Sequence, residues 1–295
     1  MELSIFYFFW TGGVKLKALR YLASTPVFRD PSLLSIFKAR LDGIEKTTCI
    51  VVNTFEELED SSLKATMCET PVRYIGPLAP PPLENNTTIS ANYFREESES
   101  LNWLDKQEPG SVIYISFGSV ASLAQDQIYE LASGVEASKQ PFLWVVRDSI
   151  TSIPEGFIER TSARGLVIEW APQLRVLSHP SVGSFLTHCG WNSTMESIHA
   201  GVPMLCFPVF GDQHLNASLV EDVWKLGVSL SKGFKDGGIV GDEVEKGIVT
   251  HMQSEDIKAR ASRWKLCSHR AIQQGGTSDL AMESIILDLM KGVTM

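Results

Sequence analysis

The chain has 295 residues, of which 44% are hydrophobic, and this is enough apolar material for one large core or two smaller ones. Its formal net charge of −9 argues against binding of nucleic acid or acidic lipid, because both need clustered lysine and arginine. The composition therefore favours a small or apolar partner.

The first apolar run, residues 5–10, is too short to span a bilayer, and it follows Glu2 instead of the basic residues of a signal peptide. It predicts the end of a buried strand or helix. No later run reaches the length of a membrane span, so we expect no stable membrane insertion. The five cysteines are odd in number and widely spread, without a Cys-x-x-Cys pair. They predict reduced thiols in a cytoplasmic protein.

Short apolar runs, rich in β-branched and aromatic residues, alternate with helix-sized segments along the chain. The runs are apolar at almost every position, as strands covered on both faces must be. The predicted strands fall in residues 49–55, 112–119, 141–147, 165–170, 182–189 and 202–209. Helical spacing predicts helices in residues 33–46, 124–140, 193–201, 213–227 and 278–290. This alternation predicts an α/β fold with helices on both faces of a parallel sheet.

A proline-rich stretch interrupts the pattern and passes into an acidic sequence rich in serine and asparagine. It has no hydrophobic period, which predicts a linker over residues 79–100. Residues 1–78 hold one convincing strand and one helical run, too little for a complete sheet. Residues 101–277 hold the material of a complete domain, and residues 278–295 hold the last helix.

Residues 188–197, HCGWNSTMES, lie between a predicted strand and a predicted helix. Three interpretations compete: a helix start capped for stability, a metal or thiol site, and a cradle for an anion. The adjacent His188 and Cys189 have no partner ligands at zinc-like spacing, which disfavours the metal site. The capped helix start stays open beside the anion cradle.

The anion cradle would lie beyond the carboxyl end of a strand, where open parallel sheets bind ligands. Gly190 permits a tight turn, and Asn192, Ser193 and Thr194 can cap the helix and leave amides pointing outward. The helix dipole adds partial positive charge, so the arrangement suits a phosphate. His188 could donate a further hydrogen bond from the strand end.

A second glycine turn, SFGSV at residues 116–120, also follows a predicted strand. Gly118 and Ser119 could bring more donors to the same place, and Glu196, one turn into the later helix, could accept from a sugar hydroxyl. Neither turn has the P-loop pattern, and no Gly-x-Gly-x-x-Gly follows a strand, so an ATPase or an NAD enzyme loses its main support.

The segment from Trp170 to Gln213 resembles, without a gap, the signature box of plant secondary-product UDP-glycosyltransferases. Supporting motifs are VNTFEELE at 52–59, YIGPL at 74–78, WLDKQEPGSVIYISFGS at 103–119, PFLWVVR at 141–147 and GGTS at 275–278. The resemblance implies two facing Rossmann-like lobes of the GT-B type. In this chain it implies a complete C-terminal lobe for the UDP-sugar and a partial N-terminal lobe, to which the helix in 278–295 crosses back.

The resemblance implies three groups of donor-binding residues, matched by position. Those for the uridine are Trp170, Ala171, Gln173 and Glu196. Those for the diphosphate are Ser119, His188, Asn192 and Ser193. Those for the sugar are Trp191, Asp212 and Gln213, and a glutamine at the last position resembles the glucose-using members. Taken singly, the tryptophans could be core aromatics, Asp212 a helix cap and His188 a core histidine. Taken together, these residues favour a single crevice that binds the UDP-sugar.

The resemblance also implies an inverting transfer of glucose from UDP-glucose to a hydroxyl of a small apolar acceptor, such as a flavonoid, terpenoid or hormone. In the family, a histidine near the start of the N-terminal lobe removes the acceptor proton, and an aspartate orients it. No histidine precedes His179 here, so we expect this base, its aspartate and most of the acceptor pocket to be absent. No donor-lobe residue is expected to replace the base.

We therefore expect little transfer by this chain, and the alternative is a non-catalytic remnant that binds UDP-sugar. UDP-sugar is a co-substrate, so no cofactor is implied, and no Asp-x-Asp cluster implies a metal. The remaining histidines receive no binding role: His179, His199 and His214 are interpreted as structural, and His251 and His269 as lying on solvated helices.

Overall fold

The computed structural model describes residues 3–5, 49–59, 71–78, 97–118, 123–146, 152–230 and 239–293. The chain divides into two compact units. Unit 1 comprises Met1–Ala79, Phe210–Leu215 and Lys265–Met295, and unit 2 comprises Pro80–Val209 and Asn216–Trp264. The predicted helix at 33–46 lies outside the described residues. Of the predicted linker, only residues 97–100 are described, and they begin helix α3 (Glu97–Leu104).

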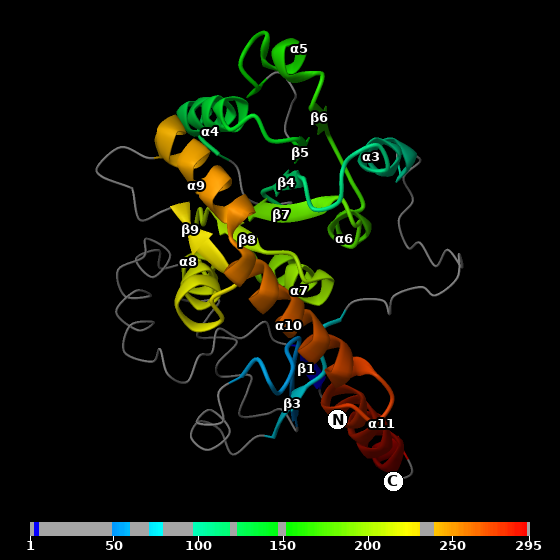
Figure 1. The fold of residues 1–295 in the computed structure, drawn as a ribbon. Helices are drawn as coiled ribbons and strands as arrows, with labels where there is room; N and C mark the ends of the chain where they lie inside the picture. The colour runs from blue at the N-terminus through cyan, green and yellow to red at the C-terminus, as the bar shows by residue number, and fades with distance from the viewer. Residues whose placement is uncertain are drawn as a thin grey trace. The chain divides into compact units, whose positions relative to one another are not determined.

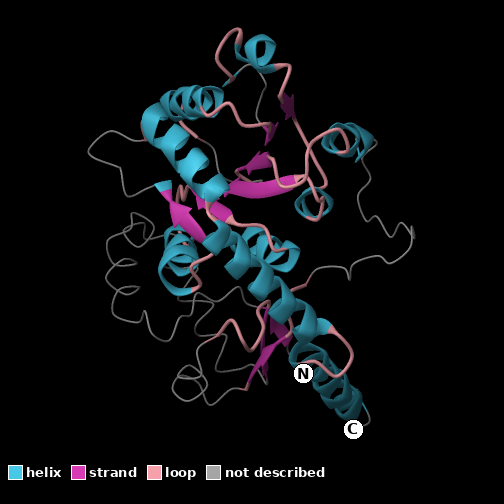
Figure 2. Ribbon diagram, in the orientation of Figure 1, coloured by secondary structure: helices cyan, strands magenta, loops and turns pink. Residues whose placement is uncertain are grey.

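Unit 2 is built on a six-stranded, wholly parallel sheet in the order β6-β5-β4-β7-β8-β9 (Figures 1 and 2). Its strands are β4 (Val112–Ser116), β5 (Phe142–Val145), β6 (Gly165–Ile168), β7 (Val182–Thr187), β8 (Met204–Cys206) and β9 (Gly227–Ser229). The first five confirm predicted strands, and β9 was not predicted. Because the strand order reverses between β4 and β7, the topological switch point of the sheet lies between these two strands.

The helices of the described chain follow the alternation that the sequence predicts. After α3 they are α4 (Gln125–Ala137), α5 (Phe157–Thr161), α6 (Gln173–Leu177), α7 (Trp191–Ala200), α8 (Gln213–Ser218), α9 (Gly241–Gln253), α10 (Glu255–Ile272) and α11 (Thr277–Val293). The helix predicted over 213–227 is not one α-helix, because α8 continues as the π-helix η4 (Leu219–Val223). None of the helices described is long and apolar enough to cross a membrane.

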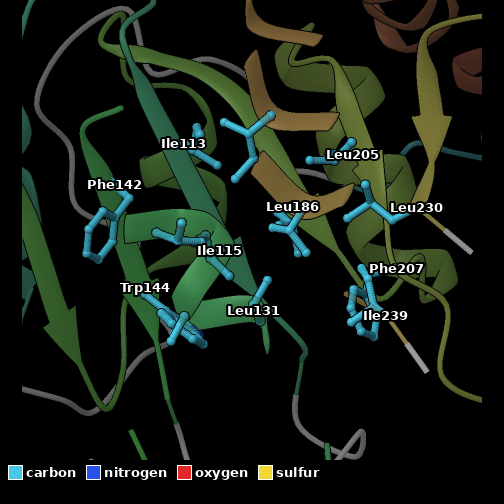
Figure 3. Packing of buried hydrophobic residues seen from close by; sticks show 14 of the residues in the cluster. Ile113, Ile115, Leu131, Phe142, Trp144, Leu186, Leu205, Phe207, Leu230 and Ile239 are labelled. Carbon is cyan, nitrogen blue, oxygen red and sulfur yellow. The ribbon is translucent and has the colours of Figure 1, made fainter. Parts of the chain in front are cut away.

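The core of unit 2 lies between the central strands and the helices α4 and α9. Ile113 and Ile115 of β4 and Leu186 of β7 are fully buried and share a cluster with Leu131 of α4 (Figure 3). Trp144 of β5 adds an edge-to-face contact with Phe157, with ring centroids 5.9 Å apart. Every residue of β4 and β5 is buried, which explains why these strands read as unbroken apolar runs.

Helices α4 and α9 pack closely, and a glycine permits this approach. A Cβ at Gly134 of α4 would lie 2.7 Å from Cγ1 of Val244 and would also meet the backbone oxygen of Gly241. The Glu130 side chain of α4 accepts a hydrogen bond from the Gly241 amide at 2.7 Å, which fixes the start of α9 against α4. The two helices therefore have little freedom to separate.

Gly134→Ala is expected to lower the free energy of unfolding of unit 2 by roughly 2 kcal/mol, because the gain in helix propensity is smaller than the cost of overpacking against backbone. Gly247→Ala in α9 is the matched control. Its Cβ would meet the end of the Leu230 side chain, which can move away. Urea unfolding measures both, and an equal effect of the two substitutions would contradict the role of the α4–α9 contact.

Unit 1 contains a second parallel sheet in the order β1-β2-β3, formed by β1 (Leu3–Ile5), β2 (Cys49–Val52) and β3 (Val72–Tyr74). Of these, the sequence predicted β2 as a strand. Ile285 of α11 packs on Val51 and Ile75, and the Ser278 hydroxyl donates to the Gly76 carbonyl at 2.6 Å. The last helix is thereby fixed on this sheet.

Candidate functional site

The residues of interest in unit 2 lie at the carboxyl ends of β4 and β7. These neighbouring strands flank the topological switch point, which is where open α/β sheets bind ligands. Ser116 and Thr187 are the last residues that pair between β4 and β7. Beyond this pair, the chain continues to Gly118 after β4 and to His188 after β7. The fold therefore brings together the two glycine turns that the sequence singled out.

The turn from β7 into α7 has an unusual backbone. Cys189 is fully buried and adopts a left-handed φ of 62°, which residues other than glycine rarely do. Its amide donates to Thr187 Oγ1 at 3.1 Å, and its carbonyl accepts from Asn216 Nδ2 at 2.9 Å. Gly190 then forms the N-cap of α7.

No side chain caps α7, and the first intrahelical bond runs from the Thr194 amide to the Gly190 carbonyl at 2.9 Å. The prediction that Asn192, Ser193 and Thr194 cap the helix is therefore wrong, because all three lie inside it. A helix start without a side-chain cap presents backbone amides and the positive end of the dipole, as an anion site requires. This removes the interpretation of a helix start capped for stability.

His188 lies between the two turns. A Cβ at Gly118 would stand 2.7 Å from its Cε1 atom, and a Cβ at Gly190 would meet its Nε2 atom. The imidazole is 9% exposed, and its Nδ1 atom has no hydrogen-bond partner among the described residues. Burial lowers the His188 pKa to about 4, against the opposite effect of the Ser116 carbonyl. The ring is thus neutral at pH 7.

An unpaired buried nitrogen costs free energy and calls for an explanation. A ligand at the switch point would supply a partner for His188, and the glycines at positions 118 and 190 leave room for the imidazole ring itself. A neutral imidazole has one N–H group, which donates either to the Ser116 carbonyl or to a phosphate oxygen. The geometry of His188 and α7 can therefore hold an anion.

A polar network joins the starts of α6 and α7. Gln173 Nε2 donates to Glu196 Oε2 at 2.7 Å and to Ser193 Oγ at 2.8 Å, and Tyr114 donates to Gln173 Oε1 at 3.4 Å. Burial raises the pKa of Glu196, and the bond from Gln173 counteracts this. Tyr114 was not predicted, although a buried tyrosine in a central strand signals that its hydroxyl needs a partner.

The aromatic residues near this network are placed by loops and helix starts. Trp170 and Ala171 lie between β6 and α6, and Ala171 is buried. Trp191, the first residue of α7, packs against Trp224, with ring centroids 6.4 Å apart and planes at 57°. The Trp264 indole donates to the Trp224 carbonyl at 3.2 Å. Neither Trp224 nor Trp264 was predicted to belong to the site.

The remaining predicted residues differ in their placement. Asn192 is exposed on α7. Ser119 lies outside the described residues. Asp212 and Gln213 belong to the segment Phe210–Leu215 of unit 1, where Gln213 Oε1 accepts from the Phe210 amide at 3.0 Å and closes its own turn. Within unit 2, hydrogen bonds join Gln173 to Ser193 and Glu196. The other predicted residues that unit 2 contains are Trp170, Ala171, His188, Trp191 and Asn192.

One histidine interpretation is wrong. His251 of α9 is only 2% exposed, and its Nδ1 atom lies 2.9 Å from Ser184 Oγ of β7, so it is a core residue. The other late histidine, His269, is half-buried on α10. His179 interacts with Asp105 at 3.1 Å and accepts from the Ser181 amide at 3.2 Å, which is a structural role. Among the residues that the structure describes, no group of three or more His, Cys, Asp or Glu could hold a metal ion.

Comparison with known proteins relates the chain to glycosyltransferases. The model of the family "UDP-glucoronosyl and UDP-glucosyl transferase" matches residues 88–233. UDP-glycosyltransferase 74E2 of Arabidopsis thaliana is 36% identical over 96% of this chain and 69% of its own length. A flavonol 3-O-glucosyltransferase of the same species is 39% identical over 91% of this chain and 59% of its own length.

Among solved structures, UGT2 of Phytolacca americana complexed with UDP-2fluoro-glucose and pterostilbene superposes with a TM-score of 0.78 at 32% identity. The match covers 88% of this chain and 58% of that one, so this chain spans only part of its relatives. The expected α/β fold of the GT-B type is confirmed by this likeness. The uncapped α7, the buried His188 and these relatives lead to one conclusion: the chain belongs to the family of plant UDP-glycosyltransferases.

Proposed function

We propose that unit 2 binds a UDP-sugar, with UDP-glucose as the donor, in the cytoplasm. The observation that carries the proposal is the buried imidazole of His188, whose Nε2 atom lies against Gly190 at the uncapped start of α7. The acidic, soluble-type composition and the free thiols of the described cysteines support the location. The complex of UGT2 with UDP-2fluoro-glucose supports a glucose donor.

Each part of the nucleotide then has its own residues. Trp170 stacks on the uracil, the Ala171 backbone and Gln173 bond its edge, and Glu196 accepts from the ribose hydroxyls. The hydrogen bond between Gln173 and Glu196 fixes these two side chains before the ligand arrives. Such preorganisation saves the entropy of ordering them on binding.

The diphosphate is held by His188, Asn192, Ser193 and Ser119 together with the amides of α7. Negative charge on the diphosphate increases as its bond to the sugar breaks, so these donors stabilise the transition state more than the ground state. Within unit 2, Trp191 contacts the sugar. No metal ion and no cofactor take part in this scheme, since neutral donors and the helix dipole face the anion.

We further propose that the whole reaction is an inverting transfer to a hydroxyl of a small apolar acceptor. The flavonol glucosyltransferase among the relatives and the pterostilbene bound to UGT2 support this class of acceptor. An inverting displacement needs a base on the face opposite the departing UDP. The second candidate function is binding of UDP-sugar without transfer.

Glu196→Ala is expected to weaken the binding of UDP and of uridine alike, by about tenfold, because a hydrogen bond from the ribose to a carboxylate is lost. Calorimetric titration of the intact chain measures both affinities. Glu136→Ala on α4 is the control, since its carboxylate pairs with Arg160 at 2.8 Å on the surface. Failure of the unsubstituted chain to bind UDP would refute the proposed function.

The two candidate functions are separated by a transfer assay with UDP-glucose and pterostilbene. Binding of UDP without detectable glucoside supports the binding role. Formation of glucoside supports the transferase.

A further inference from the structure

We propose that Asn216 is a positioning residue for the diphosphate, and this rests on the proposed function. Asn216 does not face the ligand in this scheme. It holds the carbonyl of Cys189 and thereby sets the direction in which His188 and the start of α7 point.

The contact is short and buried. Asn216 is 2% exposed, and its Nδ2 atom donates to the Cys189 carbonyl at 2.9 Å. Cys189 follows β7, which ends at Thr187, and precedes α7, which begins at Trp191. Its carbonyl therefore belongs to neither ladder of regular hydrogen bonds. A buried carbonyl of this kind needs a side-chain partner, and Asn216 provides it.

The conformation of Cys189 requires such support. A left-handed φ costs a residue with a side chain roughly 1 kcal/mol, and it persists where surrounding contacts fix it. Here the Cys189 amide is held by Thr187 Oγ1 and the carbonyl by Asn216. With both polar groups held, the peptide plane between Cys189 and Gly190 has one orientation. That plane connects His188 to the first turn of α7.

The helix that carries Asn216, α8, continues directly into the π-helix η4. The amide of Trp224 donates to the Leu219 carbonyl at 2.8 Å, the five-residue spacing of a π-helix. This wider turn carries Trp224 to its contact with Trp191. Asn216 thus contacts Cys189, and Trp224 contacts Trp191. These two contacts lie on either side of Gly190 in the turn from β7 to α7. A π-helix at this position is consistent with a role in holding a binding site.

The test compares the affinity of the intact chain for UDP with its affinity for uridine. Because uridine has no diphosphate, its binding does not depend on His188 or on the amides of the first turn of α7, and its one contact with this helix is at Glu196, further along α7. Asn216→Ala is expected to weaken UDP binding about tenfold while uridine binding changes less than about twofold. Equal loss for both ligands, or no loss for either, would overturn the proposal.

Ser197→Ala is the matched control. Its buried hydroxyl donates to the Val202 carbonyl at 2.8 Å, so it is also a side-chain bond to backbone, at the opposite end of α7. It is expected to lower the melting temperature without changing the ratio of UDP to uridine affinity. A changed ratio would show that general destabilisation, and not the turn, controls the diphosphate site.

A rescue variant keeps the test decisive if Asn216→Ala folds poorly. Glycine adopts a φ of 62° without the side-chain penalty, so adding Cys189→Gly to Asn216→Ala is expected to restore part of the UDP affinity. No recovery in a folded double variant would count against the turn. If the unsubstituted chain binds neither UDP nor uridine, the proposed function fails instead, and the two failures remain distinguishable.

Discussion

Gly118→Ala is expected to lower the affinity for UDP by about two orders of magnitude, through loss of a hydrogen bond between His188 and the diphosphate. The added methyl group would stand 2.7 Å from Cε1 and 2.8 Å from Nε2 of the imidazole, closer than real contacts allow. Since the ring is also confined by Gly190, it must move from its place. The displaced ring cannot donate to a phosphate on α7.

The chain offers a closely matched control for this substitution. Gly110 has a φ of 66°, against 70° at Gly118, but a Cβ there would meet nothing within 4 Å. Both alanine variants suffer the same backbone strain, on the order of 1 kcal/mol, and only one of them displaces His188. Calorimetry with UDP should therefore find normal affinity in Gly110→Ala. A similar loss in both variants would attribute the effect to strain.

A double-substitution cycle gives a second check on the same contact. His188→Ala alone is expected to weaken UDP binding about as much as Gly118→Ala, and the combined variant is expected to be little worse than either. Such non-additivity is the sign of two residues that act through one interaction. Additive losses would mean that the glycine affects UDP by a route other than the imidazole.

The sequence predicts the central strands well because their environment is simple. Residues buried on both faces are apolar at every position, so β4 and β5 could be recognised from composition alone. The strands β3 and β9 have three residues each, one with an arginine and one with a glycine, and carry no such signal. Their existence depends on pairing with neighbours, which lies beyond local propensity.

The candidate site was predicted in a similar, partial way. Strand ends followed by glycine located His188 and Gly118, because the topology of a parallel sheet fixes where strand ends meet. Tyr114 and Asn216 were missed, since their roles are hydrogen bonds to Gln173 and to Cys189 across the fold. The interpretation of His251 as a residue on a solvated helix also failed, because its side chain contacts Ser184 in the core.

Acidification is expected to lower the free energy of unfolding of unit 2 between about pH 6.5 and pH 4. Burial lowers the pKa of His188 and of His251 from 6.5 to about 4. In this interval the unfolded chain binds more protons than the native one, so stability falls as the pH falls. Above pH 6.5 both imidazoles are neutral in the native and in the unfolded chain, and the free energy of unfolding has its full value. Protonation at low pH lowers it by at most about 3 kcal/mol for each imidazole.

Unit 1 is expected to respond in the opposite direction because of Glu59. Burial raises the pKa of this carboxyl from 4.5 to about 7, although it accepts a hydrogen bond from Thr54 at 2.8 Å. Here the native state binds more protons than the unfolded one between pH 4.5 and 7. The stability from Glu59 is therefore present at pH 4.5 and is lost as the pH rises through 7.

The two responses can be measured separately because the tryptophans are unevenly distributed. Of the seven tryptophans, all except Trp10 belong to unit 2, so urea unfolding followed by tryptophan fluorescence reports on that unit. His251→Asn keeps a polar atom beside Ser184 and should flatten the pH dependence of this signal by about half. Hydrogen exchange of the β2 amides reports on unit 1, where Glu59→Gln should remove the loss of protection that occurs as the pH rises from 4.5 to 7. A tryptophan signal that gains stability on acidification would contradict the prediction and would mean that groups with a raised pKa in unit 2, such as Glu196, outweigh the two imidazoles.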